Sequence, residues 1–421
     1  MHSSGMEIAQ QLFTSILIIF VAGTAVSKLA QKLRIPDVVL FILTGIIIGP
    51  SALGYVNIQG SSTLNQAILL FGASFILFHG GTITKFAILK RVWISITLLS
   101  TVGVIITALV VAIGAHFILD LPFMISLLLG AILASTDPAA LVPIFQRFPI
   151  RAKVAQTVIA ESAFTDATGS ILAIVIFSMV VSSVGTSGWS VFGQFIYLAV
   201  GGIIVGVVVG GVSAFLISEN DRGLLREFTP MVIVICVLAS YVIAETAHAS
   251  GFMSVFAAGL MVGNARTLRL TILPKEELSM HHFVDALGLK FRMLIFVLLG
   301  DQVNLSLLRA HGLQAFFISL IFMFIARPLT VLACLLPDRR AKWTKQELVF
   351  FFWTRETGVI AAALIGIVSS LVSSGQLLLS ITFVAILMTL LIQASTTPLV
   401  AKILGLIDLG NYRRPIRPPS Q

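Results

Sequence analysis

The sequence has little charge and little cysteine. Charged residues make up 11% of its 421 residues and apolar residues 57%, whereas soluble domains average about 25% charged residues. Too little polar surface remains to coat a water-soluble globule of this size. The two cysteines, Cys236 and Cys334, both lie within apolar runs, which favours packing over a disulfide or a metal pair. These shortages indicate an integral membrane protein.

Several motifs are also missing. The sequence contains no GxxxxGK(S/T) phosphate loop, and its seven histidines show no metal-ligand spacing. Its first residues lack the basic segment of a cleavable signal peptide, and no loop is long enough for a soluble domain. We therefore predict no cofactor, no ATP hydrolysis and no enzyme active site.

Long apolar runs are what the sequence has instead, and about 20 such residues suffice for a helix to cross a bilayer. Thirteen runs lie near residues 8–27, 36–50, 64–83, 92–119, 122–145, 154–182, 191–217, 228–247, 251–264, 282–300, 313–336, 346–369 and 377–404. We predict an all-α membrane protein with about thirteen transmembrane helices. They form a single transmembrane domain over residues 1–404, followed by a short cytoplasmic tail over 405–421.

Basic residues orient these predicted helices. Alternate loops contain 22 of the 27 Lys and Arg residues, whereas the opposite loops contain Arg309 alone. Because cytoplasmic loops carry the excess of Lys and Arg, we expect the N-terminus outside and the C-terminus in the cytoplasm. We expect the location to be a bacterial inner membrane. The same asymmetry accounts for the net charge of +9 without a nucleic acid partner.

Two unusually short runs, 36–50 and 251–264, indicate an internal repeat. They end in the similar segments Thr44–Pro50 and Ala258–Asn264, which lie 214 residues and seven runs apart. An odd number of crossings between the copies inverts one against the other, an arrangement common in secondary transporters. The alternative is two chance packing motifs of small residues. The predicted repeats cover about 36–182 and 251–404, with linking helices over about 191–247.

The fourth run of each repeat contains charge, hydroxyls and a helix breaker. The segments are Ser135-Thr136-Asp137-Pro138 and Thr354-Arg355-Glu356-Thr357-Gly358. Backbone of this kind is tolerated at membrane depth where it lines a cavity, and interrupted helices there coordinate ions. We therefore predict that both of these helices are discontinuous.

Ionisable residues within membrane helices are costly and are functional by default. Glu161 and Asp166 lie five residues apart, so they point about 140° apart around one helix and need different partners. Arg327 is the obvious cation to keep Glu161 charged, and Ser162 adds a hydroxyl near Asp166. A lone buried carboxylate binds a proton or a cation but not both, which is the minimal chemistry of an exchanger. The alternative is that these charges form structural ion pairs.

Taken together, the motifs resemble those of the monovalent cation/proton antiporters, in the NhaP-like and animal sodium/proton exchanger branch. The resemblance covers nearly the whole chain. Its four motifs are Thr136-Asp137-Pro138, Glu161 with Asp166, Ala326-Arg327-Pro328, and Arg355 in the second crossing helix.

The resemblance implies the antiporter fold, with two inverted five-helix repeats whose discontinuous helices cross, in a homodimer whose six-helix core moves against a dimerisation domain. It implies exchange of Na⁺, or of Li⁺ or K⁺, for protons by alternating access. Asp166 would bind the cation or proton, with Asp137, Thr165, Thr136 and Ser162 coordinating or orienting it. Glu161 and Arg327 would form a structural ion pair.

Two positions depart from the family pattern. Thr165 stands where the family usually has Asn, and this neutral residue resembles the electroneutral branch. Glu356 follows Arg355 where the family usually has Gly, and it adds a buried acid beside that crossing-helix arginine. Glu356 could pair near Arg355, or with Lys290 or Arg292, or carry a second proton.

Other functions remain open from sequence alone. A sodium-coupled symporter of an organic anion would use a similar inverted-repeat fold, and a channel or a membrane sensor would also span the bilayer. His281 and His282, near the cytoplasmic end of run 282–300, could sense pH or could simply be solvated.

Overall fold

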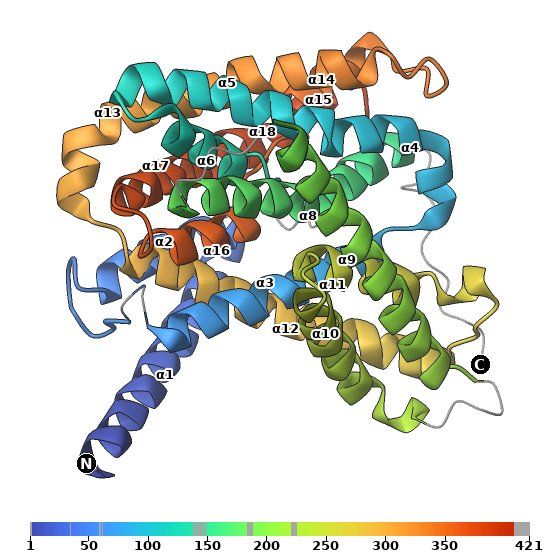
Figure 1. Ribbon diagram of the computed structural model, residues 1–421, viewed down its shortest axis with the longest axis horizontal. Coiled ribbons are helices and arrows are strands. Elements are labelled where there is room, and N and C mark those ends of the chain that lie inside the picture. Colours follow the sequence, from blue (N-terminus) through green and yellow to red (C-terminus); the bar gives the residue numbers. More distant parts are fainter. Residues whose placement is uncertain are drawn as a thin grey trace.

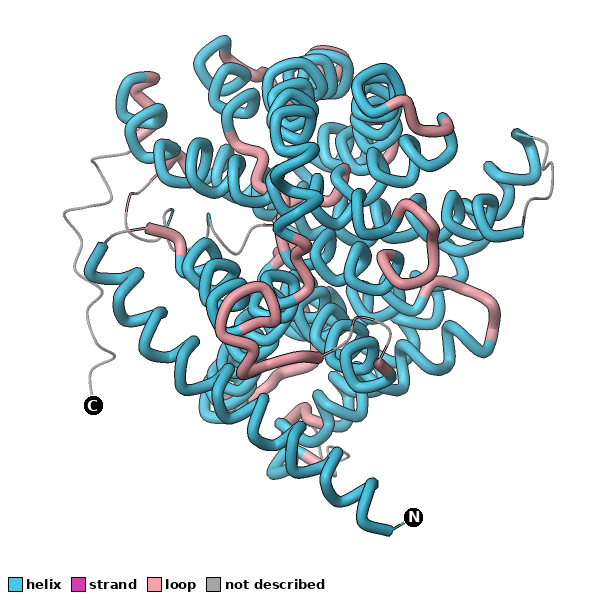
Figure 2. Tube along the Cα trace, turned by 90° about the vertical axis from the view of Figure 1, so that its left-hand side faces the viewer, coloured by secondary structure: helices cyan, strands magenta, loops and turns pink. Residues whose placement is uncertain are grey.

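The computed structural model describes residues 2–33, 35–58, 60, 62–137, 141, 145, 148, 150–182, 188–219 and 225–407. This part of the chain consists of helices and loops, and its only extended pairing is an isolated bridge between Ile150 and Ile407. Figure 2 shows the helices packed around a centre that several loops enter. The predicted all-α fold is therefore confirmed.

The helices of the first half are α1 His2–Leu33, α2 Asp37–Ile48, α3 Thr63–Ile83, α4 Phe86–Ser100, α5 Val102–Leu119, α6 Phe123–Leu133 and α8 Ala152–Ser182. Two linking helices follow, α9 Gly188–Leu216 and α10 Thr229–Thr246. The helices of the second half are α11 Gly251–Gly263, α12 Pro274–Asp301, α13 Leu305–Ile321, α14 Arg327–Leu335, α15 Lys345–Trp353, α16 Val359–Val368, α17 Gly375–Met388 and α18 Ser395–Ile403. Short 3₁₀ turns (η1 Arg226–Phe228 and η2 Ala265–Leu268) and π-helical turns (η3 Phe322–Ala326 and η4 Thr389–Ala394) complete the order.

Each of the thirteen predicted runs coincides with one helix or with consecutive helices. Among the described residues, eight helical segments are long and apolar enough to cross a membrane, and α2, α6, α11 and α16 are shorter apolar helices. The number of membrane crossings therefore stays a prediction. The run at 122–145 continues past the described segment that ends at Asp137, so Pro138 lies outside the described residues, as does most of the tail, 408–421.

Glycines show how the two halves of the chain are related. A Cβ on Gly300 of α12 would lie 2.2 Å from the carbonyl oxygen of Ile42 in α2, and one on Gly81 of α3 would lie 2.4 Å from that of Phe256 in α11. Ile42 and Phe256 are 214 residues apart, the spacing of the two similar sequence segments. The first helix of each repeat (α2 or α11) thus crosses the second helix of the other repeat (α12 or α3). Two chance packing motifs would not produce this reciprocity, whereas inverted repeats do.

The two predicted discontinuous helices are present. The helix α6 ends at Leu133, and non-helical backbone follows it as far as Asp137. The helix α15 ends at Trp353, and non-helical backbone separates it from α16, which starts at Val359. The two breaks touch, because the backbone N–H of Asp137 donates to the carbonyl of Glu356 at 2.8 Å. Helices α6, α8 and α16 lie near the middle of the molecule in Figure 1.

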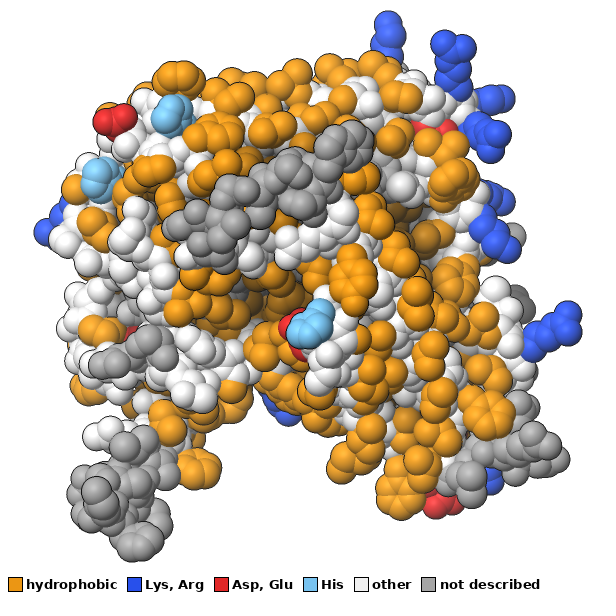
Figure 3. Space-filling model, in the orientation of Figure 1, with side chains coloured by type: hydrophobic (Ala, Val, Ile, Leu, Met, Phe, Trp, Pro, Cys, Tyr) orange, Lys and Arg blue, Asp and Glu red, His pale blue; other side chains and the backbone are white. Residues whose placement is uncertain are grey.

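The surface agrees with a bilayer environment. Large apolar side chains such as Phe13, Phe117 and Ile403 are between 74% and 79% exposed, which a protein in water would avoid. Figure 3 shows apolar side chains over much of the visible face, with most of the visible Lys and Arg gathered along one edge. The side of the membrane that this edge faces stays a prediction, and the positive-inside rule predicts the cytoplasmic side.

Candidate cation and proton site

Helix α8 carries both acids of the predicted site at the centre of the fold. The side chains of Glu161 and Asp166 are 2% and 4% exposed. The helix is continuous from Ala152 to Ser182, so the two acids leave it on different sides, as their spacing predicts. Each acid therefore meets a different set of neighbours.

Asp166 faces the break that follows α6. The hydroxyl of Ser135 donates to its Oδ1 atom at 2.5 Å, and no Lys, Arg or His of the described chain forms an ion pair with it. The carboxylate is thus buried with neutral hydrogen bonding. Ser135 was not among the predicted site residues, although it directly precedes Thr136 in the same motif.

Hydroxyl groups connect α8 to this break. The hydroxyl oxygens of Thr136 and Thr165 lie 2.6 Å apart, and the Thr165 hydroxyl donates to the Ser162 carbonyl at 3.0 Å. Because Thr165 uses its proton in that second bond, Thr136 is the donor in the first. Ser162 itself is buried one turn before Asp166. The structure therefore brings Thr136 and Thr165 into contact, next to the Ser135–Asp166 pair in the sequence.

Asp137 reaches across to the second crossing helix. Its Oδ2 atom accepts a hydrogen bond from the backbone N–H of Val359 at 3.2 Å, at the first residue of α16. A carboxylate there satisfies a free N–H and interacts favourably with the positive end of the helix dipole. A Cβ on Gly358 would lie 2.1 Å from that of Asp137, so this close approach requires glycine.

Glu161 and Arg327 form the predicted ion pair. The guanidinium binds both carboxylate oxygens of Glu161, and it also donates to the carbonyls of Phe351 at 2.7 Å and Thr354 at 2.8 Å. Those carbonyls belong to the end of α15, where free carbonyls need donors. The pair therefore ties α8 and α14 to the second interrupted helix.

Arg355 and Glu356 lie where the two breaks meet. Arg355 donates to the carbonyl of Ala134 at 2.8 Å, so it satisfies the end of α6, and its guanidinium lies 5.1 Å above the Phe322 ring. Glu356 is 1% exposed, and its Oε1 atom has no hydrogen-bond partner among the described residues. None of the ion pairs among the described residues includes Glu356, and the one of Arg292 is with Asp37 at 3.5 Å.

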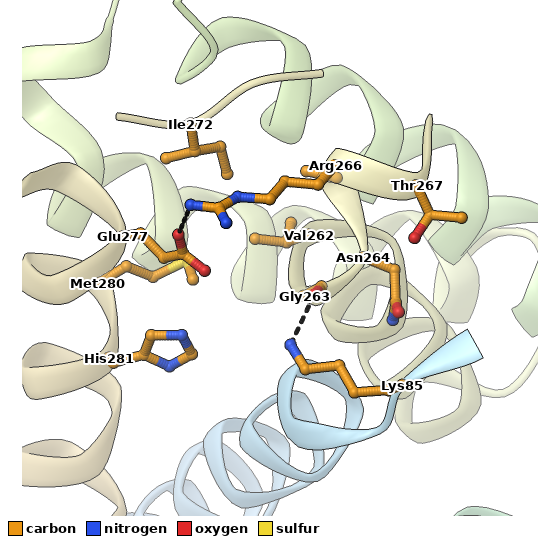
Figure 4. A pocket seen from close by; sticks show the side chains of 11 residues that line it. Lys85, Val262, Gly263, Asn264, Arg266, Thr267, Ile272, Glu277, Met280 and His281 are labelled. Atoms are coloured by element: carbon orange, nitrogen blue, oxygen red, sulfur yellow. Dashed lines mark hydrogen bonds and ion pairs between the residues drawn. The ribbon is translucent and has the colours of Figure 1, made fainter. Parts of the chain in front are cut away.

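A second group of charges lines a pocket of about 230 Å³ at the basic edge (Figure 4). Arg266 pairs with Glu277 at 2.6 Å, and Lys85 donates to the carbonyl of Gly263 at 3.1 Å. His281 points into the same pocket, and burial lowers the pKa of its imidazole despite the nearby Glu277 carboxylate. This pocket is separate from the acids of α8.

Comparisons with known proteins decide the family. The model of the transmembrane sodium/hydrogen exchanger family matches residues 16–403. The chain belongs to this family. The sequence is 32% identical to a probable Na⁺/H⁺ antiporter 2 of Methanocaldococcus jannaschii over 92% of this chain and 96% of that protein.

Other family members cover most of the chain as well. A K⁺/H⁺ antiporter NhaP of Alkalimonas amylolytica is 30% identical over 95% of this chain and 68% of its own length. The solved structure of the sodium proton antiporter MjNhaP1 of M. jannaschii superposes with a TM-score of 0.81 at 28% identity, covering 95% of this chain and all of that one. The antiporter fold is therefore confirmed, and no comparison supports the organic anion symporter.

Proposed function

We propose that this protein exchanges a monovalent cation for protons and that Asp166 is the group that binds them in turn. The observation that carries the proposal is the environment of that carboxylate. It is buried on α8 with a hydroxyl donor, Ser135, and no paired cation among the described residues. An acid without a counterion deep in a membrane protein requires a proton or a cation.

The surrounding oxygens suit a hard monovalent cation. The Thr136 and Thr165 hydroxyls are in contact and belong to the residues next to Ser135 and Asp166 in the sequence. Ser162 lies one turn before Asp166, and Asp137 is two residues beyond Ser135. Oxygen ligands of this kind bind Na⁺-like ions, with cavity size and ligand flexibility setting the selectivity. Relatives include both Na⁺/H⁺ and K⁺/H⁺ antiporters, so Na⁺, Li⁺ and K⁺ are all candidates.

The exchange would be electroneutral, one cation for one proton, because Glu161 is neutralised by Arg327 and leaves Asp166 as the carrier. We propose that the Glu161–Arg327 pair is structural, and that the protein works by alternating access as a homodimer in a bacterial inner membrane. The N-terminus would lie outside and the C-terminus in the cytoplasm.

Exchange by Asp166→Asn in proteoliposomes tests the assignment. Asn keeps the shape of the side chain but cannot ionise, so cation-induced dequenching of a pH-sensitive dye should fall to the level of empty vesicles with Na⁺, Li⁺ and K⁺. The matched control is Asp120→Asn, since Asp120 is an exposed acid in the left-handed conformation (φ 52°) that Asn tolerates. Wild-type exchange by Asp166→Asn would refute the proposal.

A further inference from the structure

A second cavity lies near the end of α2 and the start of α17, helices that are labelled on the left of Figure 1. Its volume is about 450 Å³, and it lies between the loop after α2, the end of α12 and the start of α17. Oxygen-bearing side chains dominate its lining: Ser51, Asn57, Asp301, Gln302, Asn304 and Gln376. The site on α8 shares none of these residues.

Asp301 is the acid of this cavity, and it follows the predicted run 282–300. The side chain is 4% exposed, and its Oδ2 atom accepts a long hydrogen bond of 3.3 Å from the backbone N–H of Ile58. Its Oδ1 atom is buried and has no hydrogen-bond partner among the described residues, and no described cation pairs with the carboxylate. Burial raises the pKa of Asp301 to about 7.

The neighbouring Gln302 presents a second unsatisfied oxygen. Its amide nitrogen donates to Oδ1 of Asn65 at 3.0 Å, and the amide nitrogen of Asn65 donates to the carbonyl of Gly60 at 2.9 Å. This chain of bonds fixes the orientation of the Gln302 amide. Its Oε1 atom is left buried without a partner in the described part of the chain.

Two buried, unpartnered oxygens on consecutive residues of one cavity are costly unless something binds them. A water molecule could satisfy the amide oxygen, but it would leave the negative charge of Asp301 uncompensated. One carboxylate with neutral amide and hydroxyl oxygens matches a hard monovalent cation better than a divalent one, which usually takes several carboxylates.

We propose that Asp301 and Gln302 form a second monovalent cation site, distinct from the transport site, in which a proton on Asp301 competes with the cation. The site connects the loop after α2 to the ends of α12 and α17, because all three line the cavity. A bound cation therefore stabilises the joint between the first and second halves of the chain at this cavity. The proposal does not depend on the role of Asp166.

Thermal unfolding of the purified full-length protein tests this site with Na⁺ as the probe. The transport site is first disabled with Asp166→Asn, and NaCl is compared with choline chloride at equal ionic strength. At pH 8 we expect Na⁺ to raise the unfolding midpoint by about 2–4 °C, since a ligand that binds the folded state stabilises it. At pH 6 most of the shift should disappear, because the Asp301 carboxyl is then protonated.

Adding Asp301→Asn to the Asp166→Asn protein should abolish the Na⁺-dependent shift at both pH values. Adding Asp120→Asn instead is the matched control and should leave the shift intact. If the Asp301 variant does not fold, adding Gln302→Ala to Asp166→Asn replaces it and should at least halve the shift. The proposal fails if Asp166→Asn shows no Na⁺-dependent shift, or if the shift survives both substitutions at the cavity.

Discussion

Glu161 and Asp166 belong to the same helix and are almost equally buried, yet their surroundings differ completely. The carboxylate of Glu161 meets a guanidinium with both oxygens, and that guanidinium also satisfies two carbonyls of α15. Asp166 accepts a hydroxyl hydrogen bond from Ser135. Burial is therefore common to both acids, and the counterion is what distinguishes them. Under our proposal, the carrier is the acid whose charge the protein leaves uncompensated.

Removing Glu161 from its ion pair with Arg327 should produce the largest effect, which is a loss of stability. Glu161→Ala leaves Arg327 buried without its partner, and removing one member of a buried ion pair costs about 3–5 kcal/mol. We expect a large fall in unfolding midpoint and in the yield of folded protein, measured by thermal unfolding in detergent. Folded protein that survives should still exchange cations for protons, because Asp166 is intact.

The matched control is Asp166→Ala on the other side of α8. This substitution removes a buried charge that has no ionic partner in the described structure, so it should abolish exchange with little loss of stability. If Asp166→Ala destabilises the protein as much as Glu161→Ala does, the two acids are both structural and the contrast between them is wrong.

The next largest effect should come from removing the hydrogen bond that Asp166 accepts, which should weaken cation binding. Ser135→Ala removes the hydroxyl that donates to Asp166, and a hydrogen bond to a charged group contributes about 1.5–3 kcal/mol. We expect the half-saturating cation concentration for exchange to rise by about tenfold or more, with stability nearly unchanged. The measurement is dye dequenching over a range of cation concentrations.

A second serine of α8 provides the control for this experiment. The hydroxyl of Ser170 donates to the carbonyl of Ala167 in its own helix, so Ser170→Ala should leave cation affinity close to that of the wild type. Equal effects of Ser135→Ala and Ser170→Ala would mean that the bond to Asp166 has no special role.

The sequence predicted the parts of this architecture that follow from hydropathy and spacing. Apolar runs located the helices, and the 214-residue separation of the short runs revealed the inverted repeat. The spacing of Glu161 and Asp166 indicated that they need different partners, and the permanent charge of Arg327 made it the obvious partner for one. Each of these features follows from residue types and from their spacing along the chain, without knowledge of how the helices pack.

Contacts made where the two breaks cross could not be read from the sequence. Nothing local shows that Ser135 meets Asp166, that Asp137 reaches the start of α16, or that Arg355 satisfies the end of α6. Each contact joins residues at least 31 positions apart, and each depends on how two half-helices approach. Asp301 is a similar case, because it directly follows the apolar run 282–300 and nothing in the local sequence shows that the fold buries its side chain.

Glu356 is a second candidate for carrying protons, because it is another buried acid with an oxygen that has no hydrogen-bond partner among the described residues. If Asp166 is the sole carrier, Glu356→Gln should change the exchange rate by less than about threefold, or about 0.7 kcal/mol in activation free energy. Exchange by both proteins should then be insensitive to an imposed K⁺/valinomycin potential. An exchange rate that follows the potential in the wild type and loses that dependence in Glu356→Gln would identify Glu356 as a second proton carrier.

The smallest effect should come from the pocket at the basic edge. Burial lowers the pKa of His281, so the folded protein binds that proton less readily than the unfolded chain does. The histidine therefore does not affect the free energy of unfolding at high pH. It lowers that free energy as the pH falls below the ordinary pKa of histidine, because the unfolded chain then binds the proton more readily. Because the ring is only partly buried, we expect His281→Gln to move the pH profile of exchange by less than about 0.3 pH units.

The exposed His282 is the control for that measurement, and His282→Gln should leave the pH profile unchanged. Dequenching between pH 6 and pH 9 would give the profile of each variant. A shift of a full pH unit in His281→Gln, absent in His282→Gln, would make the pocket a pH sensor. The uncompensated charge of Asp166 would then not be enough to explain how exchange depends on pH, because protonation of His281 in this pocket would also affect the exchange rate.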